Sequence, residues 1–133
     1  MESLRDLRFL KLWLILGCIW VGLVIFLSLT PAPTQPFDFP GIDKVGHACA
    51  YGFLMFWFGL IYKPGRAYRY LGLGFVLMGI ILECMQGALG DRTFEWGDVA
   101  ANAFGVIAGL ALSGTKLSEA LLRVEGKLVQ NEP

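Results

Sequence analysis

The stretch DKVGHACAY, residues 43–51, opens an apolar segment with a base, an imidazole and a phenol. Lys44, His47 and Tyr51 stand at positions i, i+3 and i+7, which fall on one face of an α-helix. An imidazole can act as a general base or nucleophile, and a lysine can hold a phosphate or a developing oxyanion. Tyr51 could contact a ligand on the same face, or it could be an aromatic residue of a membrane interface. Because Lys44 and His47 lie near the positive amino end of a helix, we expect a carboxylate or an anionic ligand beside them.

Glu83 offers such a carboxylate from a second apolar segment. A lone ionised carboxylate in hydrocarbon costs several kcal/mol, so Glu83 is expected to be paired, protonated or hydrated. Its available partners are Lys44, His47 and Arg92. In a catalytic interpretation, Glu83 would orient His47 or act as an acid, while Arg92 and Lys44 would hold a phosphate.

Four further polar residues allow two interpretations each. Gln86 and Asn102 could position a ligand, or they could join helices by hydrogen bonds within the membrane. Asp43 and Asp98 stand where helices should begin and could be N-caps. All four belong to the same half of the membrane as His47, so we expect the polar residues to gather there.

Metal and redox chemistry have weaker support. One histidine with scattered carboxylates is little evidence for a metal site, although His47, Glu83 and Asp98 could form one, and we predict neither a metal nor another cofactor. The three cysteines lie in apolar segments without CxxC spacing, so we interpret them as buried small side chains. Cys49 and Cys84 stand at similar predicted depth, which leaves a disulfide between them as a weak alternative.

The elements that must position these residues are four long apolar runs. Each approaches the roughly 20 residues that a helix needs to cross a bilayer. The runs are residues 12–29, 45–62, 70–89 and 98–115. The sequence therefore predicts an all-α bundle of four transmembrane helices, with a membrane domain at 12–115, a short segment at 1–11 and a tail at 116–133.

The distribution of basic residues predicts the orientation. Of eleven lysines and arginines, only Lys44 and Arg92 fall on one side of a four-span arrangement. The positive-inside rule then puts both termini in the cytoplasm and the chemistry-bearing residues at the outer face. The net charge is zero and no basic block is present, so nucleic acid is not an expected partner.

Toward the inner side of the membrane, the helix faces that carry Glu83 and Asn102 continue as rows of small residues. Gly79 lies one turn before Glu83, and Gly105 and Gly109 follow Asn102 at helical spacing. Glycine at such spacing lets helix backbones approach closely. We therefore predict that Gly79, Gly105 and Gly109 mark helix contacts and that the polar faces point into the bundle.

Three ordered motifs resemble the VanZ-like family of small bacterial membrane proteins. They are DKVGHACAY at 43–51, the E-x-x-Q of ECMQ at 83–86, and R-x5-D-x3-N-x2-G within RTFEWGDVAANAFG at 92–105. The similarity covers about residues 30–112. It implies a multi-pass protein of the bacterial inner membrane, and the family's founding member is associated with low-level resistance to the lipoglycopeptide teicoplanin.

Three function classes follow from these residues. The first is an envelope protein in the lipid bilayer that binds an anionic lipid, a lipid-linked precursor or a lipoglycopeptide through Lys44, His47 and Arg92. The second is a membrane-embedded acid–base enzyme acting on a lipid headgroup through His47 and Glu83. The third is a small proton-coupled transporter, for which Glu83 would carry the proton. Whether the chain acts alone or as a homodimer is left open.

Overall fold

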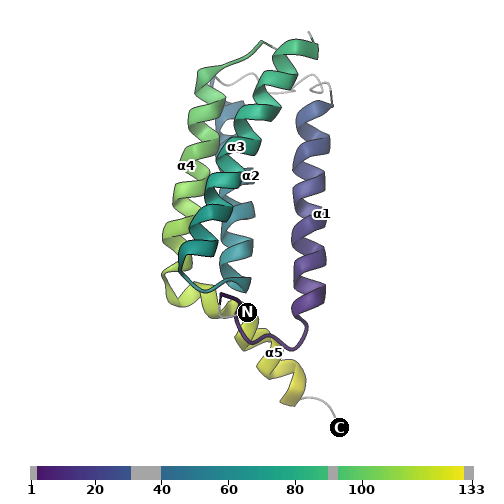
Figure 1. Cartoon of the computed structure of the whole chain (residues 1–133), viewed down its shortest axis with the longest axis vertical. Helices are drawn as coiled ribbons and strands as arrows, with labels where there is room; N and C mark the ends of the chain where they lie inside the picture. The colour runs from purple at the N-terminus through teal and green to yellow at the C-terminus, as the bar shows by residue number, and fades with distance from the viewer. Residues whose placement is uncertain (1–2, 31–39, 90–92, 131–133) are drawn as a thin grey trace.

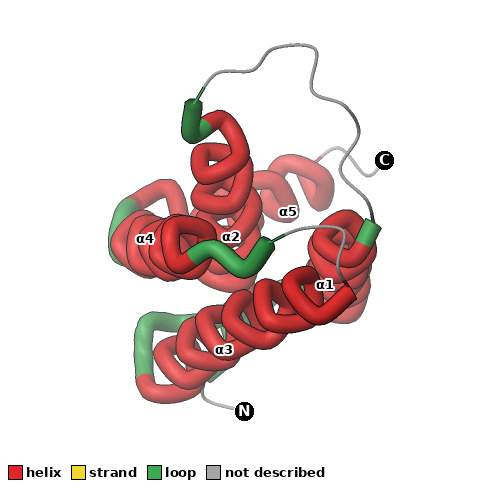
Figure 2. The backbone as a smooth tube through the Cα atoms, turned by 90° about the horizontal axis from the view of Figure 1, so that it is seen from above, coloured by secondary structure: helices red, strands yellow, loops and turns green. Residues whose placement is uncertain are grey.

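The computed structural model describes residues 3–30, 40–89 and 93–130, and their regular elements are helices. Four of these helices are long and apolar enough to cross a membrane, which confirms the predicted all-α four-span bundle. They run side by side, with α1 and α4 on opposite sides of the bundle (Figures 1 and 2). The elements are α1 (Leu10–Leu29), α2 (Ile42–Ile61), α3 (Arg66–Leu89), α4 (Trp96–Ser113), the short 3-10 helix η1 (Lys116–Glu119) and α5 (Ala120–Gln130).

Each long helix begins before the apolar run that predicted it. The predicted starts were residues 12, 45, 70 and 98, whereas the helices start at Leu10, Ile42, Arg66 and Trp96. The apolar runs were bounded by charge, but the backbone hydrogen bonds of a helix continue through charged residues at its ends. The extra turns carry Asp43 and Lys44 into α2.

The pair α2 and α4 packs most closely, with glycine on both sides of the contact. A Cβ added to Gly109 would lie 2.7 Å from the carbonyl oxygen of Gly52 and 2.9 Å from the amide nitrogen of Phe56. A Cβ on Gly105 would collide with the carbonyl oxygen of Ala48. Since these neighbours are backbone atoms, only glycine permits this approach.

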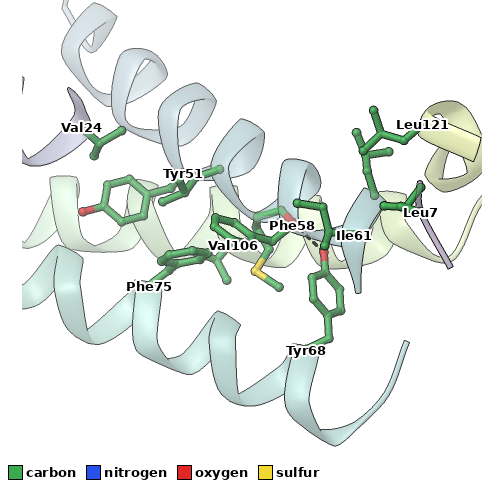
Figure 3. Packing of buried hydrophobic residues seen from close by; sticks show 12 residues of the cluster. Leu7, Val24, Tyr51, Phe58, Ile61, Tyr68, Phe75, Val106 and Leu121 are labelled. Carbon is green, nitrogen blue, oxygen red and sulfur yellow. Dashed lines mark hydrogen bonds between the residues drawn. The ribbon is translucent and has the colours of Figure 1, made fainter. Parts of the chain in front are cut away.

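The half of the bundle nearer α5 has an apolar core. Leu54, Met55 and Ile61 of α2 are completely buried there, with Val106 of α4 beside them (Figure 3). Tyr68 crosses this core from α3 and donates its hydroxyl to the carbonyl oxygen of Met55 at 2.8 Å. The bond gives a polar atom a partner without breaking the packing.

The first helix joins this core through aromatic residues. The ring of Phe58 and the indole of Trp57 lie against Gly17, and a Cβ at Gly17 would meet the Phe58 ring at 2.9 Å. The indole nitrogen of Trp57 also donates to the carbonyl oxygen of Trp13 at 3.1 Å. Much of the remaining surface of α1 is apolar and exposed, as expected for a helix that faces lipid.

The described ends of the chain meet at one end of the bundle, as an even number of spans requires (Figure 1). The carboxylate of Glu125 in α5 accepts hydrogen bonds from the amides of Arg8 and Phe9 at 2.8 and 3.0 Å and from the Trp13 indole at 2.7 Å. Burial raises the pKa of Glu125, but these hydrogen bonds outweigh it and hold the pKa below its usual range. The helix α5 was not predicted within the tail.

Candidate functional site

The polar residues gather at the end of the bundle opposite α5, where α2 and α4 begin and α3 ends (Figure 1). We call them the polar cluster. Three helices and the segment before α4 contribute to it, so the sequence correctly placed its members in one half of the bundle. The described members are Asp43, Lys44, His47, Glu83, Glu95, Asp98 and Asn102.

Lys44 is surrounded by carboxylates. Its ammonium lies 2.8 Å from Glu95, 3.2 Å from Asp43 and 3.3 Å from Asp98. Gly97 makes room for this arrangement, because a Cβ there would lie 2.5 Å from Cε of Lys44. The negative charge expected beside Lys44 is therefore present within the chain, from Asp43, Glu95 and Asp98 and not from Glu83.

His47 connects α2 with α4. Its Nδ1 lies 3.1 Å from Oδ1 of Asn102, which can only accept, so Nδ1 carries the hydrogen. In the neutral ring, Nε2 then presents a lone pair, 3.7 Å from Oδ2 of Asp98. Gly79 leaves space for the amide, since a Cβ at that position would approach Nδ2 of Asn102 to 3.0 Å. Asn102 thus fixes the histidine tautomer.

Glu83 is 2% exposed, and only one of its two carboxylate oxygens has a hydrogen-bond partner among the described residues. Its Oε1 accepts the backbone N–H of Glu95 at 3.0 Å, while Oε2 has no hydrogen-bond partner among the described residues. One carboxylate oxygen of Glu83, one of Asp98 and one ring nitrogen of His47 lie within 4.8 Å of one another. The pairing predicted for Glu83 is therefore made by a backbone amide, and the histidine stands close by.

The interpretation of Asp43 and Asp98 as N-caps is wrong. The N-cap residue of α2 is Gly41, with φ +86°, and that of α4 is Glu95; neither makes a side-chain capping bond. Because both helices begin earlier than predicted, Asp43 and Asp98 fall inside the first turn. The helix dipole still favours carboxylates at these positions.

Gln86 makes the helix-joining hydrogen bond that one of its two interpretations predicted. Its Nε2 donates to the carbonyl oxygen of Ser28 at 2.6 Å and so ties α3 to the end of α1.

Tyr51 is 1% exposed within the core, which excludes the interfacial alternative (Figure 3). Its hydroxyl is buried without a hydrogen-bond partner in the described part of the chain. Arg92 lies outside the described residues.

The cysteines differ from their prediction. Cys18, Cys49 and Cys84 are free thiols on the outer surface of the bundle, so they are neither buried nor paired with one another. Burial was expected because cysteine packs as a small apolar side chain in soluble proteins. In a membrane the outer surface is also apolar, and a thiol can face lipid.

Two residues of the arrangement were missed. Glu95 was not among the predicted site residues, yet it binds Lys44 through its side chain and Glu83 through its backbone. Gly52 faces Gly105 across the closest helix contact, with the Gly105 carbonyl 3.3 Å from a Cβ on Gly52. The spacing of Ala48 and Gly52, four residues apart, was the available signal for this contact.

Comparisons with protein-family models, with curated proteins and with solved structures find no match. The chemistry of the site therefore follows from its geometry. A partly buried imidazole beside two buried carboxylates can exchange protons, bind a cation or hold a polar headgroup.

Proposed function

We propose that the chain is a VanZ-like, multi-pass protein of the bacterial cytoplasmic membrane, with both termini in the cytoplasm. The support is the placement of basic residues relative to the helices. Lys44 lies at the end of the bundle that carries the polar cluster, and the others in the described ranges lie toward the opposite end. These are Arg5, Arg8, Lys11, Lys63, Arg66, Arg69, Lys116, Arg123 and Lys127. By the positive-inside rule, the polar cluster then lies at the outer leaflet.

We propose further that the polar cluster binds the headgroup of a lipid-linked cell-envelope molecule, or of a lipoglycopeptide antibiotic. The observation that carries this proposal is the convergence of His47, Glu83 and Asp98, from three helices, toward one end of the bundle. Ionisable groups inside a membrane protein are seldom kept for packing alone. A helix bundle that needed only stability would not place two buried carboxylates there.

Lys44 provides the contact for an anionic part of such a ligand. Of its three carboxylate partners, Glu95 has the most exposed side chain, at 49%. A phosphate arriving from the membrane surface can replace Glu95 at the ammonium without disturbing buried Asp98. This exchange explains how a lysine that is already paired can still select an anion.

Native mass spectrometry with lipid extraction tests the binding proposal. Wild-type protein should retain a phosphate-bearing lipid or cell-wall precursor, and Lys44→Ala and His47→Ala should lose it. Lys63→Ala is the matched control, since Lys63 is exposed on the loop between α2 and α3, toward the opposite end of the bundle. Equal retention by wild type, Lys44→Ala and Lys63→Ala would contradict the proposal.

A second candidate is a membrane-embedded acid–base enzyme acting on the same headgroup. The observation that favours it is the tautomer of His47, whose Nε2 lone pair faces the acidic side of the cluster. Purified protein should then convert its bound lipid, and His47→Ala should abolish conversion. Product formation at the wild-type rate by His47→Ala would end this mechanism.

The proposal does not extend to a proton-coupled transporter. Leu54, Met55, Ile61 and Val106 fill the described core on the other side of the cluster and are at most 1% exposed. Nothing in the described part of the chain connects Glu83 to the opposite face of the membrane.

A further inference from the structure

One partly buried side chain and two buried side chains of the polar cluster come together. His47 belongs to α2, Glu83 to α3 and Asp98 to α4, and one ligand atom of each lies within 4.8 Å of the other two. The side chains of His47 and Asp98 are 15% and 4% exposed, and residue Glu83 is 2% exposed. Each group is therefore held by a different helix and is shielded from bulk water.

Two buried carboxylate oxygens of this group, Oε2 of Glu83 and Oδ1 of Asp98, have no hydrogen-bond partner among the described residues. Oδ1 of Asn102 accepts from Nδ1 of His47, so in the neutral ring the lone pair of Nε2 lies on the side of Oδ2 of Asp98, 3.7 Å away. Burying several acceptors without a donor is costly, and a cation among them would satisfy all three.

The charges of the polar cluster also favour a cation among these side chains. The described cluster holds four carboxylates and one ammonium: Asp43, Glu95 and Asp98 contact Lys44, whereas Glu83 binds the Glu95 amide. Lys44 approaches Oδ1 of Asp98 and leaves Oδ2 toward His47. The described residues therefore carry a surplus of negative charge on the side of the cluster away from Lys44, where a divalent ion would be stabilised.

We propose that His47, Glu83 and Asp98 bind a divalent first-row transition-metal ion. An imidazole nitrogen with two carboxylate oxygens suits Zn²⁺ or Mn²⁺ better than Mg²⁺ or Ca²⁺, which prefer oxygen ligands alone. Tetrahedral Zn²⁺, with bonds of about 2.1 Å, keeps its ligand atoms about 3.4 Å apart. The His47 and Asp98 atoms, at 3.7 Å, are already near that separation.

Asn102 has the role of an outer-shell residue in this site. Metal-bound histidines almost always donate their other ring N–H to a fixed acceptor, which orients the ring, and Oδ1 of Asn102 is that acceptor. Three protein ligands leave a coordination position open for water or for a ligand group. The metal site goes beyond the proposed headgroup binding and does not depend on it.

Metal titration of chelator-treated protein in lipid nanodiscs tests the site. Zn²⁺ added in competition with a chromophoric chelator should bind wild type at one ion per chain. His47→Ala and Asp98→Asn should weaken binding at least tenfold, and Asn102→Ala should weaken it by about 10- to 100-fold. Asp43→Asn is the matched control, since Asp43 also contacts Lys44 but is not one of the three ligands.

A second measurement uses wild-type protein alone and does not depend on how the variants fold. Mn²⁺ bound to wild type should show coupling to an imidazole nitrogen in pulsed electron paramagnetic resonance. The absence of saturable Zn²⁺ binding, or of nitrogen coupling, would overturn the proposal. A loss of affinity in Asp43→Asn as large as that in Asp98→Asn would also overturn it, because the ion would then occupy the carboxylates around Lys44.

Discussion

Replacing Gly109 with alanine should force α2 and α4 apart. The new Cβ would lie 2.7 Å from the Gly52 carbonyl oxygen, 2.7 Å from Cβ of Met55 and 2.9 Å from the Phe56 amide nitrogen. Ordinary contacts begin near 3.4 Å, so the helices must separate by roughly 0.5 to 0.7 Å. None of these neighbours can rotate away, because two are backbone atoms and the third is a Cβ.

The magnitude follows from two opposing terms. Overpacking a close contact costs about 1–3 kcal/mol, while alanine in place of glycine favours a helix by about 1 kcal/mol. We expect Gly109→Ala to lower the free energy of unfolding by up to about 2 kcal/mol. The displacement of α4 should also weaken the bond between His47 and Asn102, and therefore any ligand binding at the polar cluster.

Gly74→Ala is the matched control, because a Cβ on Gly74 meets nothing within 4 Å. It should be neutral or slightly stabilising. Reversible unfolding in mixed micelles, followed by tryptophan fluorescence, measures both variants under one set of conditions. If Gly109→Ala is as stable as Gly74→Ala, the close contact between α2 and α4 does not exist as described.

Three further predictions concern the hydrogen bonds of single side chains. Tyr68→Phe should lower the free energy of unfolding by about 1 kcal/mol, because the Met55 carbonyl loses its donor; unchanged stability would contradict this bond. Gln86→Leu should loosen α1, seen as faster hydrogen exchange near Ser28, whereas unchanged exchange would show that the Gln86 bond does not hold the helix. The lowered pKa of Glu125 stabilises the fold above its ordinary value of 4.5, and this contribution should be lost as the pH falls through the folded pKa. Limited proteolysis of α5 should show that acid sensitivity in wild type, and its persistence in Glu125→Gln would contradict the assignment.

Hydropathy and helical spacing were enough to predict the four spans. They also placed His47, Glu83 and Asn102 in one half of the bundle, because polar groups on apolar helices avoid lipid. The structure brings them together within the same cluster. This part of the site follows from periodicity, since the spacing of residues on a helix fixes the face they share.

The partners within the cluster could not be predicted in the same way. Lys44 binds Glu95 because Gly97 lets its side chain lie across the start of α4, and that approach depends on how two helices cross. Gln86 binds Ser28, 58 residues away, through a contact that has no local signal. The N-cap prediction failed because a charged residue does not mark the first residue of a membrane helix.

The contact of Glu125 with the start of α1 sets an order for assembly. The amides of Arg8 and Phe9 leave the ribosome early, whereas the carboxylate that binds them is synthesised more than a hundred residues later. The first span must therefore enter the membrane with these donors hydrated, and docking of α5 completes its amino end last. A truncation before residue 125 should leave that end open, while a fusion placed after the described end of α5 should spare it.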